Sequence, residues 1–77
     1  MRKELANKQI YDDFISKTIL SEIELEVLIK YIKGDSIVKI ADETQYGTAT
    51  VSRIIAKVKN KYDNYKKLEL AKLMILQ

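Results

Sequence analysis

The 77-residue chain contains no proline and only two glycines, Gly34 and Gly47, which lie on either side of a short segment. Proline and glycine most often interrupt regular structure, so every other part of the chain can be helical. The order from Leu20 to Ile54 is then an apolar helix, a glycine stop, a short helix, a turn and a third helix. This compact order predicts an all-α fold that contains a helix-turn-helix.

Chain length and composition limit the protein to one modest domain. Chains of this size bury only about 60% of their unfolded surface. Cysteine and histidine are absent, so there are no disulfides and no thiolate or imidazole metal ligands, and no cofactor is implied. We expect one compact helical bundle over 1–77. An N-terminal helix would occupy 1–17, the helix-turn-helix core 18–62, and a C-terminal helix 63–77, with a plausible short break at Asp63-Asn64.

The first segment has apolar side chains at helical spacing. Ala6, Ile10 and Phe14 are four residues apart, and Leu5 and Ile15 lie beside them. This pattern predicts one helix over 2–16 with a single apolar stripe.

The second segment carries both a start and a stop signal for a helix. Ser21 and Glu24 have the spacing of a capping box, in which each side chain accepts a hydrogen bond from the other residue's backbone amide. Gly34 best tolerates the left-handed turn that commonly ends a helix. The apolar residues between these signals are Ile23, Val27, Leu28, Tyr31 and Ile32.

The third segment predicts a helix of about two turns. Asp35 or Ser36 can cap its start, and Ile37, Ile40 and Ala41 would face inward.

The fourth segment predicts the last helix of the core. We expect Gly47 to provide the turn before it and the Thr48 hydroxyl to cap it. Its apolar residues recur at three and four positions, which identifies the buried side. They are Val51, Ile54, Ile55, Val58 and Tyr62.

Positive charge is concentrated in one region. Residues 1–33 carry six basic and six acidic side chains, whereas 47–67 carry six basic side chains and only Asp63 as an acid, a net charge of +5. A positive field on the third helix of the core and the link after it suits nucleic acid. A solvated basic face would have the same composition.

The side of this helix opposite the apolar stripe has the residue types that a major-groove reader needs. Small side chains allow close approach, and the Arg53 guanidinium can span the O6 and N7 acceptors of guanine. An exposed arginine paired with a surface acid is the alternative. We expect base contacts from Ala49, Ser52, Arg53 and Ala56. We expect phosphate contacts from Lys39, Thr48, Thr50, Lys57, Asn60 and Lys61.

The C-terminal segment is more apolar than packing on one core requires. Leu68, Ala71 and Ile75 form one stripe, and a second stripe lies beside it. We expect this helix to form a homodimer interface through Leu70, Leu73 and Met74. The alternative is a helix buried between the core and the N-terminal helix.

These residues resemble the LuxR/GerE-type DNA-binding domain over about residues 18–76. The positions that carry the resemblance, without a gap, are Leu20-Ser21, Glu24, Glu26-Val27-Leu28, Gly34, Ser36, Ile40-Ala41 and Thr50-Val51. Leu68-Glu69-Leu70 is similar to the start of that family's fourth helix. The resemblance implies base contacts near Ser52, Arg53 and Ala56, phosphate contacts near Thr50 and Lys57, and dimerisation through the last helix.

The chain departs from the family pattern at five positions. Ile23 stands where the family commonly has arginine, Thr44 and Tyr46 where it has leucine and isoleucine, Gly47 where serine is frequent, and Ile54 where histidine is common. The promoter-reading C-terminal domain of sigma factors and related small phage regulators look similar over 20–61.

The sequence thus predicts a cytoplasmic, homodimeric transcription regulator that binds double-stranded DNA. No apolar run approaches a membrane span, and no small-molecule ligand is evident. The rival is a helical protein-binding module that uses the same scaffold. An enzyme is not expected, because no nucleophile-base pair, metal ligand set or phosphate loop is present.

Overall fold

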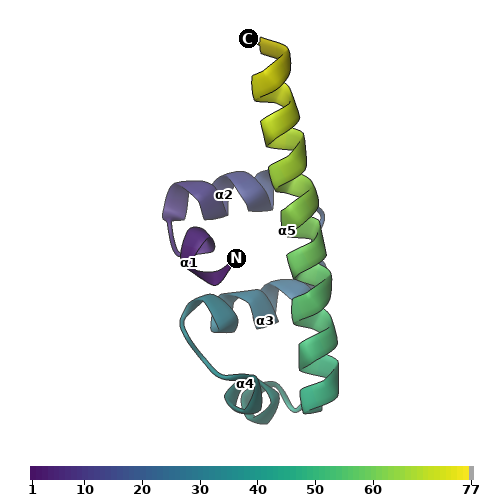
Figure 1. Ribbon diagram of the computed structural model, residues 1–77. Coiled ribbons are helices and arrows are strands. Elements are labelled where there is room, and N and C mark those ends of the chain that lie inside the picture. The colour runs from purple at the N-terminus through teal and green to yellow at the C-terminus, as the bar shows by residue number, and fades with distance from the viewer. Residues whose placement is uncertain (77) are drawn as a thin grey trace.

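The computed structural model describes residues 1–76, and all regular structure in this range is helical. The helices are α1 (Arg2–Leu5), α2 (Lys8–Lys17), α3 (Glu22–Ile32), α4 (Ile37–Thr44) and α5 (Thr48–Leu76). α5 runs the full height of the molecule, and the four shorter helices lie along one side of it (Figure 1). The expected all-α class is confirmed.

The N-terminal segment forms two helices, so the single helix expected over 2–16 is wrong. α1 ends at Leu5, and α2 begins after Asn7, whose side-chain oxygen accepts a hydrogen bond of 2.9 Å from the Gln9 amide. A capping side chain of this kind starts a new helix. The bend places Leu5 in the core and leaves the predicted Ala6 exposed.

The capping box expected at the start of α3 is confirmed. The Ser21 hydroxyl accepts from the Glu24 amide at 3.2 Å, and the Glu24 carboxylate accepts from the Ser21 amide at 3.1 Å. The stop signal is confirmed too, because Gly34 adopts a φ of 101° just after the helix. Residues with a Cβ rarely adopt this conformation.

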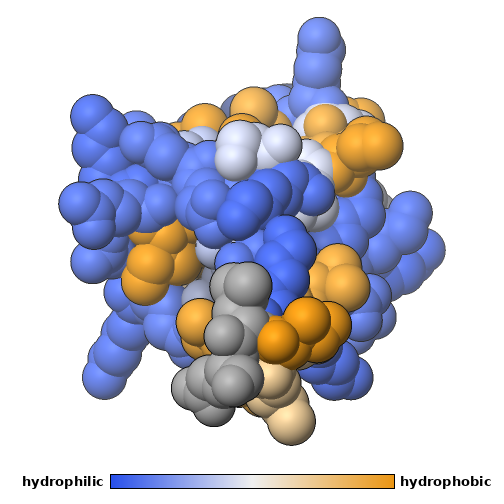
Figure 2. All heavy atoms as spheres, turned by 90° about the horizontal axis from the view of Figure 1, so that it is seen from above, coloured by the Kyte–Doolittle hydropathy of each residue, from blue (hydrophilic) through white to orange (hydrophobic). Residues whose placement is uncertain are grey.

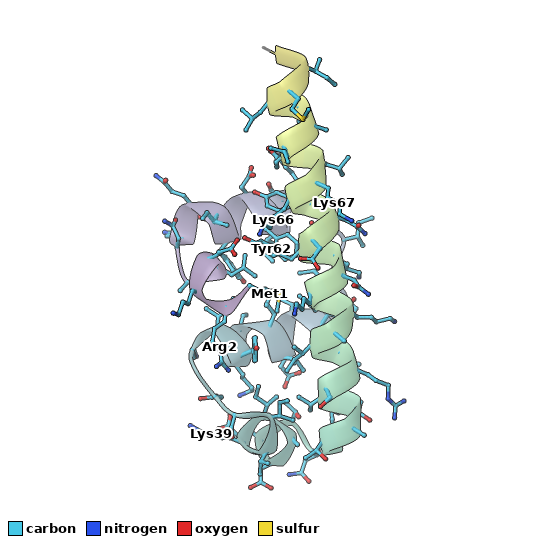
Figure 3. The ribbon with its side chains drawn as sticks, in the orientation of Figure 1. Met1, Arg2, Lys39, Tyr62, Lys66 and Lys67 are labelled. Carbon is cyan, nitrogen blue, oxygen red and sulfur yellow. The ribbon has the colours of Figure 1, made fainter. Side chains whose placement is uncertain are left out.

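Arg2 joins α1 to the C-terminal end of α3. Its guanidinium donates to the carbonyl oxygens of Tyr31 at 2.7 Å and Asp35 at 3.0 Å, and it lies 4.0 Å from the centre of the Tyr31 ring. Figure 3 shows Arg2 above the loop between α3 and α4. The Tyr31 carbonyl oxygen also accepts from the Gly34 amide at 3.1 Å, so Arg2 adds a second hydrogen bond to a carbonyl at the end of α3.

Ser36 caps the start of α4, since its hydroxyl accepts from the Lys39 amide at 3.1 Å. Ile40 and Ala41 are buried as expected. Ile37 is 37% exposed, so its predicted inward position is wrong. The first three residues of α4 are all exposed, so the buried face of this helix begins only at Ile40.

The turn between α4 and α5 differs from the sequence expectation. Gln45, with a φ of 65°, adopts the left-handed conformation, and Gly47 does not. Gly47 instead accepts the first hydrogen bond of α5, from the Val51 amide at 3.0 Å. Thr48 is the first residue of α5 and therefore not its cap.

The core consists of two clusters that meet at α5. Ile54 packs against both clusters and joins them. The buried residues of the first cluster, under α1 and α2, are Leu5, Phe14, Leu28, Val58 and Tyr62. Those of the second, under α4, are Val27, Ile40, Ala41 and Val51.

The break expected at Asp63-Asn64 is wrong, because α5 passes through both residues without interruption. Asp63 and Asn64 are only weakly unfavourable in a helix. The rings of Tyr62 and Tyr65, on either side of them, lie 5.3 and 5.4 Å from the Phe14 ring of α2. This packing holds both sides of the expected break in one helix.

Candidate nucleic-acid interface

The first half of α5 presents one continuous exposed face. Val51, Val58 and Tyr62 point into the bundle and are almost fully buried. The side opposite to them is bare, because the other helices all lie on the core side of α5 (Figure 1). The exposed residues that share this outer face are Ala49, Ser52, Arg53, Ala56, Lys57 and Asn60. The structure thus brings together all four predicted base-contacting residues.

The outer face combines small side chains with long cationic ones. Ala49, Ser52 and Ala56 are small, so another surface can approach the helix backbone closely there. Arg53 and Lys57 supply long cationic side chains. Among the described residues, the ion pairs involve neither of these two. The alternative in which Arg53 serves a surface ion pair is therefore not observed.

The start of α5 adds hydroxyl and amide donors at the end of this face. Thr48 and Thr50 are exposed in the first turn. The first amides of a helix have no internal acceptors, and they suit anionic groups such as phosphate.

A hollow beside the start of α5 was not expected from the sequence. It has a volume of about 340 Å³ and lies between α4 and the turn that precedes α5. Val38, Asp42, Gln45 and Thr48 are among its lining residues. Val38 could have indicated this hollow in the sequence, because it is an apolar residue that lies off the buried face of α4. Its side chain is 67% exposed.

Lys39, predicted to contact phosphate, lies apart from the outer face of α5. Its ammonium is 3.3 Å from the Asp35 carboxylate and 3.9 Å from that of Glu43. Figure 3 shows Lys39 at the edge of α4 away from α5. We therefore leave Lys39 out of the candidate interface.

Lys61, also predicted to contact phosphate, forms hydrogen bonds within the protein instead. Its ammonium donates to the Ile19 carbonyl oxygen and to the Glu24 carboxylate, both at 2.9 Å. Glu24 is only 8% exposed; its Oε1 accepts from both the Lys61 ammonium and the Ser21 amide, and its Oε2 has no hydrogen-bond partner among the described residues. Burial raises the pKa of Glu24, but the hydrogen bonds from Lys61 and Ser21 outweigh burial, and the net pKa is lowered. Lys61 therefore holds α5 to α3.

Two tyrosines hold the middle of α5 against the N-terminal helices. The Tyr62 hydroxyl donates to the Glu4 carboxylate, and the Tyr65 hydroxyl donates to Asp13. The bond to Asp13, with burial, raises the pKa of Tyr65 to about 12, while the bond from Tyr62 lowers the pKa of Glu4. These contacts fix the outer face of α5 relative to the rest of the bundle.

The C-terminal end of α5 stands clear of the bundle (Figure 1). Leu70, Leu73 and Met74, the predicted dimer residues, are between 59% and 70% exposed. The alternative in which this helix is buried between the core and the N-terminal helix is therefore wrong.

Comparisons of the chain with protein-family models, with curated proteins and with solved structures find no match. Within residues 1–76, no helix is both long enough and apolar enough to cross a membrane. The interface must therefore be judged on its own geometry and charge.

Proposed function

We propose that the protein is a sequence-specific regulator of transcription that binds duplex DNA in the cytoplasm, with residues 49–60 of α5 in the major groove. The observation that carries this proposal is the outer face of α5, where small side chains lie opposite the buried stripe together with Arg53 and Lys57, which form no ion pair within residues 1–76. α3, α4 and α5 follow one another with short connections, as in a helix-turn-helix. The resemblance to LuxR/GerE-type domains points the same way.

The residues of this face divide between two tasks. Ala49, Ser52 and Ala56 let the helix approach the bases, and Arg53 donates to guanine. Thr48, Thr50, Lys57 and Asn60 hold the backbone phosphates and set the register without reading sequence.

We further propose that two chains associate through Leu70, Leu73 and Met74. Full burial of one such side chain contributes about 1.5–3 kcal/mol. If the dimer buries all the surface that these three side chains expose in the single chain, they contribute roughly 3–6 kcal/mol per chain. Association itself costs about 4–15 kcal/mol. A dimer through this line alone is consequently weak.

Titration of duplex DNA at several salt concentrations tests the proposal. Binding that neutralises phosphates releases counterions, so the logarithm of the affinity should fall linearly with the logarithm of salt concentration. Selection from a random duplex pool should then yield half-sites about one helical turn apart. Absence of binding at low salt, or affinity that ignores salt, would rule out the DNA function.

The exposed apolar end of α5 supports a second candidate, a helical module that binds another protein. In that case Leu73→Glu would abolish partner binding, and Arg53→Ala would leave it unchanged. DNA binding predicts a loss of sequence preference from Arg53→Ala.

A further inference from the structure

The C-terminal end of α5 carries a second exposed apolar line that the proposed dimer does not use. Leu68 and Ile75 are 64% and 82% exposed, with Ala71 between them. At about 100° per residue, Leu68 and Ile75 lie within about 20° of each other around the helix. Leu73, on the first line, lies about 140° away from Leu68. One neighbouring helix cannot cover both lines.

The bundle leaves most of both lines uncovered, because every large side chain of the two lines is at least 59% exposed. α2 reaches along α5 as far as Glu69, whose carboxylate is 3.0 Å from the Lys17 ammonium. Beyond that ion pair, α5 continues without a neighbouring helix (Figure 1). Figure 2 looks down on this end of the molecule, and hydrophobic side chains lie on more than one side of the tip. A helix that is apolar on most sides is normally enclosed by others.

The short length of the projecting end also argues against a simple pair of helices. From Leu68 to Ile75 the helix rises only about 10 Å. Two-stranded coiled coils normally sustain their apolar seam over at least three or four heptads. Specific protein interfaces involve about 20–30 residues from each partner, and one line of three large side chains falls far short. Copies of the same end, packed on both lines, increase the buried area without lengthening the helix.

We propose that the protein assembles as four chains, a pair of dimers, whose α5 ends meet in one helical bundle. Within each dimer the contact is the line of Leu70, Leu73 and Met74, so the proposal rests on the homodimer proposed above. Leu68, Ala71 and Ile75 form the contact between dimers. The occupant of the second line is therefore another copy of this chain.

This assembly gives the protein a further activity, the bridging of two DNA sites. Arg53 lies 20 residues before Leu73 on one uninterrupted helix, a distance of about 30 Å. The DNA-reading faces would therefore lie well away from the central bundle, and each dimer could hold its own duplex.

The assembly is tested by measuring mass with sedimentation equilibrium and native mass spectrometry at micromolar concentrations. The wild type should form a particle of four times the chain mass of 8.9 kDa. The double variant Leu68→Glu/Ile75→Glu and the single variant Leu73→Glu each leave only one contact line intact, so neither should form a particle larger than a dimer. The control variant Gln9→Glu/Asn64→Glu, which adds the same two negative charges at exposed positions that belong to neither line, should leave four chains. A wild type of two chains or one, or a double variant that still forms four, would overturn the proposal.

Bridging is measured by the capture of a labelled duplex on an immobilised duplex, both taken from the sequences selected by the protein. The wild type should capture the labelled duplex, and the double variant should lose capture but keep its affinity for a single duplex. Capture by the double variant at the wild-type level would exclude bridging through Leu68 and Ile75. If the wild type forms four chains but binds no DNA, the proposed function fails while the assembly stands.

Discussion

The Lys61 ammonium lies 2.9 Å from the carboxylate of Glu24, a side chain that is only 8% exposed. The pair joins the start of α3 to the middle of α5. The same carboxylate accepts the Ser21 amide in the capping box, so one acidic group serves both the local helix start and the tertiary fold.

Replacement of Lys61 by methionine should destabilise the protein. The substitution leaves Glu24 buried with only the Ser21 amide as a partner, and loss of one partner of a buried polar group costs about 1–3 kcal/mol. Urea unfolding followed by circular dichroism measures the change in the free energy of unfolding. Lys59→Met, an exposed position on the same helix, is the matched control and should shift it by less than about 0.5 kcal/mol. Equal effects from the two substitutions would show that the pair adds no stability.

Acid should remove the contribution of this pair. The pKa of Glu24 is lower in the folded protein than its ordinary value of 4.5, so its stabilising effect is complete above pH 4.5 and is lost as pH falls through the folded-state pKa. Glu4, Asp13 and Glu69 have lowered pKa values as well, and they add to the loss. The difference in unfolding free energy between wild type and Lys61→Met should shrink below pH 4. A difference that stays constant with pH would contradict ionisation of Glu24 as its cause.

The two glycines should respond differently to alanine. A Cβ would meet no atom within 4 Å at either position, but only Gly34 has a positive φ. Gly34→Ala should therefore cost about 1–2 kcal/mol of unfolding free energy, the strain of a left-handed conformation. Gly47→Ala should change it by less than about 1 kcal/mol. Equal losses of unfolding free energy from the two substitutions would show that the positive φ does not explain why glycine occupies position 34.

Arg53→Ala and Lys57→Ala should separate base reading from phosphate binding. Loss of the guanidinium should cost about 1–3 kcal/mol on the selected sequence and little on random duplex. Loss of the Lys57 ammonium should weaken both duplexes alike and reduce the salt slope by about 1. Competition titrations with both duplexes measure these effects. If the two variants behave identically on both, the assigned roles are wrong.

Much of the fold could be predicted where the signal is local. The capping box of Ser21 and Glu24 depends on residues three apart, and Gly34 ends a helix through its own backbone freedom. The buried positions Val51, Val58 and Tyr62 follow from helical periodicity alone. The same periodicity places Arg53 and Lys57 on the opposite, exposed side.

The errors fall where a distant contact decides the outcome. Lys61 has a cationic side chain that could bind phosphate, but in the folded protein it donates a hydrogen bond to Glu24, which lies 37 positions away in the sequence. The spacing of residues along the chain does not predict this distant pair. The bend at Asn7 was missed for a different reason, because the four-residue spacing of Ala6, Ile10 and Phe14 concealed a local cap.

The sequence by itself determined an all-helical chain, its helix starts and stops near Ser21, Gly34 and Ser36, and the two sides of α5, because backbone capping and helical periodicity act over a few residues. Only the tertiary structure decided that α5 passes through Asp63 and Asn64 and then projects beyond the bundle. Weak helix propensities at those two residues are outweighed by ring packing of Tyr62 and Tyr65 on Phe14, which exists only once α2 has folded against α5.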